Sequence, residues 1–234
     1  MIIKSSIGIG RIGIGVSSAI AIPSGSIALW LMADAGVAVS GTNVTAWGDQ
    51  SGNGNNATAY NNPQLITNAL NSKPVISFNG STSYASFPIS LSAATDRTIF
   101  IVGKYNDVNR EQEGFLALGT DQGYVFRDSQ TQNTYYYTGE GQISAPASIV
   151  TNYHIVTVNH LYFGDSAMAI NGTFGNSQGI ELYAINDGRI ALRLLVGGEY
   201  ASVNIAEIII YNRQLNGTER GQVQSYLNTK YAIY

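Results

Sequence analysis

Short apolar runs alternate with polar clusters along most of this chain. Within the runs, apolar residues recur at every second position or continuously, as in β-strands with one or both faces buried. Clusters of Gly, Asn, Asp and Pro between the runs predict turns. Roughly ten or more short strands without intervening helices predict an all-β, antiparallel β-sandwich. The runs are "SIALWLM", "NVTAWG", "PVISF", "RTIFIVGKY", "GFLALG", "YVFR", "NTYYYT", "YHIVTVNHLYF", "SAMAING", "RIALRLLVGG" and "VNIAEIIIYNR".

The C-terminal stretch "NGTERGQVQSYLNTKYAIY" departs from this pattern. Asn216, followed three residues later by Glu219, forms a capping-box pattern, which marks the start of a helix. Apolar and aromatic residues then recur at helical spacing, at Val223, Tyr226, Leu227 and Tyr231. The strand before it, residues 205–211, is apolar at both parities, so we expect it to be covered on both faces. The helix would supply the second cover.

The N-terminal stretch "SIGIGRIGIGV" alternates isoleucine and glycine in two phases. Ile7 and Ile9 share one parity, Ile12 and Ile14 share the other, and Arg11 shifts the phase by one residue. We therefore predict two short strands, 5–10 and 12–16, joined by a bulge or turn at Arg11. Glycine on one face permits close approach of another backbone. That backbone belongs either to this chain's own sheets or to a neighbouring subunit.

Composition and charge exclude several classes of partner. Charged residues make up 12% of the 234 residues and the formal net charge is −3, so the basic field that nucleic-acid binding requires is absent. No stretch approaches the ~20 apolar residues of a membrane-spanning helix, and we expect no membrane insertion. Cysteine is absent, which excludes disulfides and thiolate metal sites. Lys4 precedes a glycine-interrupted apolar segment that fits a secretion signal poorly.

Five blocks, taken together, resemble the concanavalin A-like lectin and laminin G-like jelly-roll superfamily in its bacterial and phage versions. The resemblance covers about residues 27–234 and leaves residues 1–26 outside. We therefore expect an N-terminal arm or added strands over 1–26, followed by a single sandwich with one C-terminal helix. The blocks are "LWLMADAGV", "VTAWGDQSGNGNNATAYNNPQL", "KPVISFNGSTSYASF", "YHIVTVNHLYFGDSAMAINGT" and "IAEIIIYNRQLNGTERGQVQSYLNTKYAI".

The loop "DQSGNGN" is a candidate calcium site, because it places Asp49, Ser51, Asn53 and Asn55 within seven residues. The loop begins like an EF-hand, but Tyr60 stands where the bidentate glutamate belongs, which rejects that motif. The resemblance implies frequent calcium sites near such loops. The alternative is an Asx-turn, in which the side chains bond nearby backbone amides. No other cofactor is expected.

Tyrosine is abundant, with 15 copies. In "NTYYYTGE", Tyr135 and Tyr137 share one strand face, and such a pair can stack on sugars or contact protein. Weaker candidates near loops are Tyr60, Tyr105 and Tyr124. The alternative is structural, because tyrosine is a good strand former.

We expect no enzyme activity. Glucanases of the resembled superfamily carry a Glu-x-Asp-x-x-Glu strand that brings two carboxylates together, and this motif is absent. Glu111 and Glu113 lie in the polar stretch "NDVNREQEG", which is more simply a solvated loop.

The sequence favours a structural or adhesive protein of a phage particle, such as a tail-fibre, minor tail or capsid-decorating protein. Its arm, with Ile7, Ile9, Arg11, Ile12 and Ile14, would contact other virion proteins or a second copy, since an unpaired edge invites pairing. The sandwich would contact host glycans. The alternatives are a secreted or cell-surface bacterial carbohydrate-binding module and, less favoured, a polysaccharide hydrolase or lyase.

Overall fold

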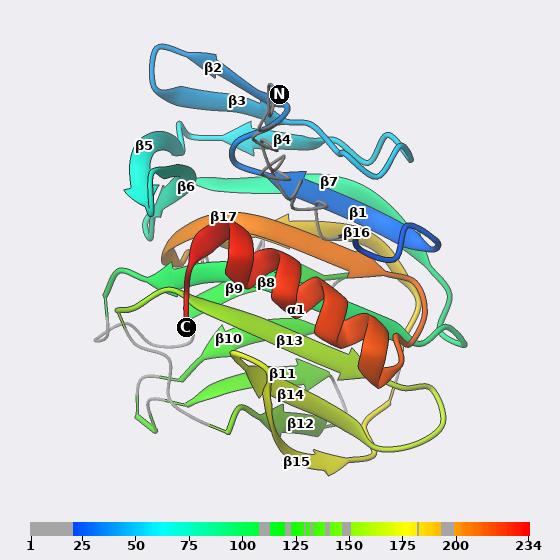
Figure 1. Ribbon diagram of the computed structural model, residues 1–234. Coiled ribbons are helices and arrows are strands. Elements are labelled where there is room, and N and C mark those ends of the chain that lie inside the picture. The colour runs from blue at the N-terminus through cyan, green and yellow to red at the C-terminus, as the bar shows by residue number, and fades with distance from the viewer. Residues whose placement is uncertain are drawn as a thin grey trace, which may run out of the picture.

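The computed structural model describes residues 21–234, apart from 108–112, 120–122, 129, 132, 139–140, 147–150, 182 and 193–198. Its described residues form seventeen antiparallel strands and a C-terminal helix (Figure 1). This confirms the predicted all-β class and the single helix at the end. The predicted arm strands, 5–10 and 12–16, lie outside the described residues.

Strand pairing divides the molecule into two layers. The first, which we call the helix-side layer, consists of β5 (Gln64–Leu70), β6 (Lys73–Asn79), β1 (Ile27–Met32), β17 (Ser202–Tyr211), β8 (Arg97–Tyr105), β13 (His154–His160), β14 (Ser166–Ile170) and β15 (Thr173–Gln178). The second, the open layer, consists of β2 (Val37–Ser40), β3 (Asn43–Trp47), β4 (Ala57–Tyr60), β7 (Tyr84–Leu91), β16 (Ile185–Ile190), β9 (Glu113–Leu118), β10 (Tyr124–Arg127), β11 (Thr134–Thr138) and β12 (Gly141–Ser144). The two layers are continuous through one β3–β5 pair, Asn43 with Gln64.

The hydrophobic core lies between the layers. Ile101 and Ile208 of the helix-side layer share one buried cluster with Phe87, Leu116 and Ile190 of the open layer. Because successive side chains of a strand point to opposite faces, each layer also has an outer face. The two outer faces are used differently.

Helix α1 (Gly217–Tyr231) covers the outer face of the helix-side layer (Figure 1). Its start is the predicted capping box: the Asn216 side chain accepts from the Glu219 amide at 3.0 Å, and the Glu219 carboxylate accepts from the Asn216 amide at 2.9 Å. Helix and sheet residues form a second buried cluster, which includes Phe100, Ile155, Ile209, Val223, Leu227 and Tyr231. The prediction that residues 205–211 are covered on both faces is confirmed. No helix of the described part is long and apolar enough to cross a membrane.

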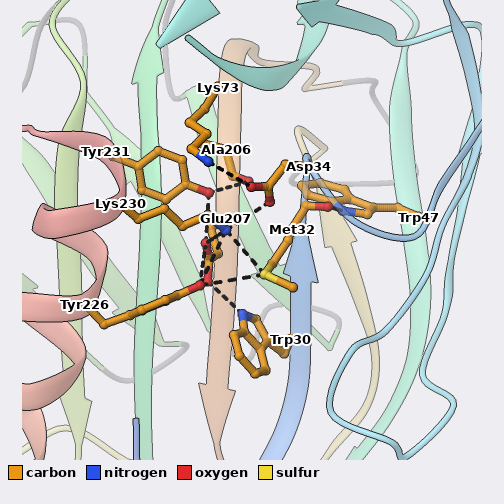
Figure 2. A network of polar contacts seen from close by, with 10 residues as sticks. All are labelled: Trp30, Met32, Asp34, Trp47, Lys73, Ala206, Glu207, Tyr226, Lys230 and Tyr231. Carbon is orange, nitrogen blue, oxygen red and sulfur yellow. Dashed lines mark hydrogen bonds and ion pairs between the residues drawn. The ribbon is translucent and has the colours of Figure 1, made fainter. Parts of the chain in front are cut away.

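A buried carboxylate fixes the position of the helix on the sheet (Figure 2). Glu207 of β17 accepts hydrogen bonds from the Tyr231 hydroxyl at 2.8 Å and the Trp30 indole at 2.6 Å. It also pairs with the Lys230 ammonium at 2.8 Å, which in turn reaches Asp34 at 2.9 Å. Burial, followed by the nearby Glu207 charge, raises the pKa of Tyr231. The partners of this carboxylate come from β1 and from the helix, so the network joins the helix to the sheet.

Candidate functional site

The outer face of the open layer carries a continuous row of side chains. Residues directly opposite each other in antiparallel strands point to the same face. Following these pairs from β4 to β11 gives Thr58, Ser86, Arg189, Ala117, Tyr124 and Tyr137. Tyr60 and Tyr135 lie on the same face. Their partners on the neighbouring strands, Tyr84 and Phe126, lie beside them on that face. The structure therefore brings four of the five predicted tyrosines onto one face.

Tyr135 and Tyr137 are the half-exposed members of this row. Their rings lie 5.7 Å from Phe126 and 6.2 Å from Tyr124, respectively. Tyr136, between them, points into the core, so the predicted alternation is confirmed. Tyr124 is fully buried, which corrects its assignment as a ligand contact: its ring packs beside that of Tyr137, its partner on the neighbouring strand.

A small pocket of about 150 Å³ opens beside Tyr135. Gln142 and Ser144 of β12 line it, together with Asn176 and Gln178 of β15. Amide and hydroxyl groups both donate and accept hydrogen bonds, and among the described lining residues none carries a charge. The pocket thus combines an aromatic wall with neutral polar groups, which is the arrangement that suits a polyhydroxylated ligand.

Tyr60 belongs to a second aromatic group at the other end of the same face. It is 40% exposed, and its ring is stacked on Tyr84 at 4.6 Å with an interplanar angle of 11°. The Tyr84 ring lies 6.1 Å from that of Tyr200. Burial raises the pKa of Tyr84, and the neighbouring tyrosines raise it further. Between the two groups, Arg189 forms an ion pair with Asp187.

Tyr105 was wrongly predicted as a ligand contact. It is fully buried, its ring lies 4.2 Å from that of Phe115, and the Arg127 guanidinium lies 5.2 Å from its ring centre. The run "RTIFIVGKY" is apolar at both parities, so parity alone did not show which side chains of β8 face outward.

The four candidate calcium ligands do lie in one loop, and both oxygens of the Asp49 carboxylate and the side-chain nitrogens of Asn53 and Asn55 are engaged in bonds within the protein. The Asp49 carboxylate accepts from the Trp30 amide at 2.9 Å, the Asn55 amide at 3.0 Å, and the Ser51 amide and hydroxyl at 2.9 and 2.7 Å. The side-chain amides of Asn53 and Asn55 donate to the carbonyls of Ile27 and Ala28, at 2.7 and 2.8 Å. These bonds favour the Asx-turn alternative, which ties the loop to β1.

Calcium binding at this loop stays a prediction. In the described part of the chain, no group of three or more His, Asp or Glu residues is placed to hold a metal ion. The side chains of Glu111 and Glu113 lie outside what the structure describes.

An exposed aromatic pair, Tyr162 and Phe163, was missed by sequence reasoning. The two residues follow β13, are 44% and 84% exposed, and their ring centres lie 4.2 Å apart. The Tyr162 amide donates to the Asp96 carboxylate at 2.7 Å, which fixes the turn. Pockets of about 380 and 400 Å³ flank the pair. The signal in the sequence was two adjacent aromatics directly before the turn residues Gly164 and Asp165.

Comparisons with known proteins place the chain by its fold. No family model matches it, and no curated protein matches it. Solved structures do match. Trypanosoma rangeli sialidase in complex with sialic acid has a TM-score of 0.65 and 16% identity, over 90% of this chain and 34% of that one. The likeness shows the fold alone.

Two toxin structures match in the same way. The binding domain of Paraclostridial Mosquitocidal Protein 1 has a TM-score of 0.66 and 17% identity, over 88% of this chain and 53% of that one. A structure of botulinum neurotoxin type C, whose cell entry depends on interaction with two ganglioside molecules, has a TM-score of 0.65 and 12% identity, over 87% of this chain and 52% of that one. This chain therefore spans about a third to a half of the proteins that it resembles.

Proposed function

We propose that this protein is a non-catalytic glycan-binding module with the strand order of a concanavalin A-like jelly roll, and that its binding site is the Tyr135 pocket. The observation that carries the proposal is the partly exposed Tyr135 ring beside a pocket lined by Gln142, Ser144, Asn176 and Gln178. An aromatic ring covers the apolar face of a sugar, and amides and hydroxyls bond its hydroxyl groups. Structural neighbours described with sialic acid and with gangliosides support glycan binding as a general capacity of such a fold; both of those ligands are acidic, so they support the binding of a glycan and not its class.

The same pocket supports a binding role rather than hydrolysis. Glycoside hydrolysis generally uses two carboxyl groups on either side of the scissile bond. Among the described residues lining the Tyr135 pocket there is no carboxylate. Incubation with any polysaccharide that binds should therefore release no new reducing ends and no unsaturated product. Either product would overturn the non-catalytic part of the proposal.

For its biological setting, we propose a structural or adhesive component of a phage particle that contacts host-surface glycans. The sequence resemblance and the glycine-rich N-terminal stretch support this setting, with the arm residues from Ile7 to Ile14 contacting a second copy or other virion proteins. The alternative is a secreted bacterial carbohydrate-binding module. Mass spectrometry of purified virions separates them: the protein is expected in the particle, and its presence only in culture medium would overturn the phage setting.

The binding experiment is a glycan array that includes malto-, cello- and chito-oligosaccharides, with and without a calcium chelator. Tyr135→Ala should lower affinity for the glycans that bind by about tenfold or more, the worth of a ring contact of ~1.4 kcal/mol. Tyr135→Phe, which keeps the ring, should retain most of it. The matched control is Phe174→Ala, a 39% exposed aromatic on the helix side, which should bind as the unmodified protein does. A blank array overturns the proposed function.

A further inference from the structure

The Tyr135 pocket and the hollow beside the aromatic pair are lined by residues that are consecutive in the chain. Gln178 lines the Tyr135 pocket, and the next residue, Gly179, lines the hollow that Tyr162 and Phe163 wall on the other side. Consecutive Cα atoms are about 3.8 Å apart, so the two depressions are neighbours. The segment from Gln178 to Glu181 lies between them and lines both.

This segment has free space above its backbone at Gly179. A Cβ atom at Gly179 would have no heavy atom within 4 Å, so a ligand can pass over the backbone without meeting a side chain there. Phe163, at 84% exposure, stands on the far side of the hollow. Its turn is fixed by two bonds, from the Tyr162 amide to Asp96 at 2.7 Å and from the Leu161 amide to the Ser166 hydroxyl at 3.1 Å. These bonds hold the backbone that carries the ring, which lowers the entropy lost when the ring contacts a ligand.

Charge around the aromatic pair selects against acidic ligands. Asp96 bonds the Tyr162 amide, Glu181 lines the hollow, and Asp165 follows the pair by two residues. The Arg213 guanidinium on the Asp96 side is already held by both Glu219 oxygens, at 2.8 and 2.7 Å. A sialylated or uronic-acid chain would meet these carboxylates, and among the described residues that line the two pockets flanking the pair the one cation is Arg213, which Glu219 already holds.

We propose that a single non-acidic glycan chain of several sugar residues occupies both depressions, with one sugar on Tyr135 and a later sugar on Phe163. The ligand class is thus a neutral oligosaccharide bound along its length, rather than one terminal sugar. This inference rests on the proposed function, because the Tyr135 pocket is its first contact.

The test is a calorimetric length series, of one to six sugar residues, made from the neutral glycan that gives the strongest array signal. Affinity should rise by about tenfold once the chain is long enough to reach Phe163, the worth of a second ring contact of ~1.4 kcal/mol. Phe163→Ala should remove that rise and leave the shortest chains unaffected. Tyr135→Ala should weaken binding at every length. Because Phe163 is exposed, its replacement leaves the core intact, which an unchanged melting temperature confirms.

The outcomes separate the two proposals. If glycans bind but affinity does not depend on length, or Phe163→Ala behaves as the Phe174→Ala control does, the extended site is wrong and the proposed function stands. If only acidic glycans bind, the extended neutral site is also wrong. If no glycan binds at all, the proposed function fails together with it.

Discussion

His160 is a buried residue of β13 whose ring is held on both sides. Its Nδ1 atom lies 2.9 Å from the Tyr136 hydroxyl, and its Nε2 atom lies 3.1 Å from the Glu181 carbonyl. A neutral ring satisfies both contacts, with Nδ1 accepting and Nε2 donating. Burial, and then the positive charge of Arg97, lower the pKa of His160 to about 3. The ring thereby supports the backbone at Glu181, which borders the proposed extended site.

We predict that the protein loses stability as the pH falls from 6.5 toward 3. In this window the unfolded chain protonates His160 at its ordinary pKa of 6.5, whereas the folded protein holds it neutral to about 3. Each pH unit then costs up to about 1.4 kcal/mol in the free energy of unfolding. Urea titrations at pH 7, 6, 5 and 4 measure this slope, which should be shallower for His160→Gln. Equal slopes in the two proteins would contradict the assignment.

Asp49 stabilises its loop by accepting four hydrogen bonds within the protein. Asp49→Ala removes the acceptor for three backbone amides and the Ser51 hydroxyl, so it should lower the free energy of unfolding by about 1–3 kcal/mol. A chelator should leave the melting temperature of the unmodified protein unchanged. Thermal denaturation with and without EDTA measures both effects. A chelator-dependent drop in melting temperature would instead favour the calcium alternative.

At the scale of the element, the helix depends on the buried Glu207–Lys230 pair. The Glu207 side chain is fully buried and that of Lys230 is 13% exposed. Removing one partner of a buried pair costs about 3–5 kcal/mol, because the other charge is left uncompensated. Lys230→Met should therefore destabilise the protein by about this much. The double variant Lys230→Met with Glu207→Gln should recover part of the loss, measured by chemical denaturation.

The matched control for the helix is the Arg213–Glu219 pair, whose side chains are 34% and 24% exposed. Arg213→Met removes a solvent-screened pair, and such pairs contribute little to stability. If the Lys230 variant costs no more than this control, or if the double variant is no more stable than Lys230→Met alone, the buried network does not anchor the helix.

Sequence patterns over a few residues correctly predicted features of single helices and strands. The Asn216–Glu219 box and the alternation around Tyr136 depend on neighbours a few residues away, and both are confirmed. Strand β15, "TFGNSQ", lacks apolar alternation because it is largely exposed, so the sequence pattern did not show it. Yet β15 supplies Asn176 and Gln178 to the pocket. Its contribution depends on pairing with β14, which periodicity does not report.

Long-range pairing also created the aromatic groups of the open face. One aromatic group combines tyrosines from segments far apart in the sequence. The register of β4 with β7 places Tyr60 opposite Tyr84, and a later segment brings the Tyr200 ring to within 6.1 Å of the Tyr84 ring. Spacing therefore identified Tyr60 as a candidate without identifying its partners. For Tyr105, the sequence did not show that the side chain is buried. Its strand is apolar at both parities, so the pattern does not distinguish the side chains that face the core from those that face outward.

At the scale of the whole molecule, the outer faces of the two layers differ in what covers them. The helix covers one face and makes it part of the core, whereas in the described chain the face from β4 to β12 has no helix over it (Figure 1). Partly exposed aromatic rings can be retained there because they are not needed to cover the core between the two layers. We therefore expect Tyr135→Ala on this face to affect folding less than variants of Lys230 and Glu207, which lie under the helix.

The segment that leads into β1 is part of the folded unit, although it lies outside the family resemblance. The Pro23 carbonyl accepts from the Tyr211 hydroxyl and the Ser26 carbonyl from the Asn212 amide, both at 2.9 Å. Ile22 packs against the buried cluster between the helix and the helix-side layer. A chain starting at residue 27 should therefore be less stable than one starting at residue 21, by about 1–3 kcal/mol for two hydrogen bonds and a partly buried side chain. Chemical denaturation of the two truncated chains measures the difference; equal stability would show that residues 21–26 contribute nothing to the fold.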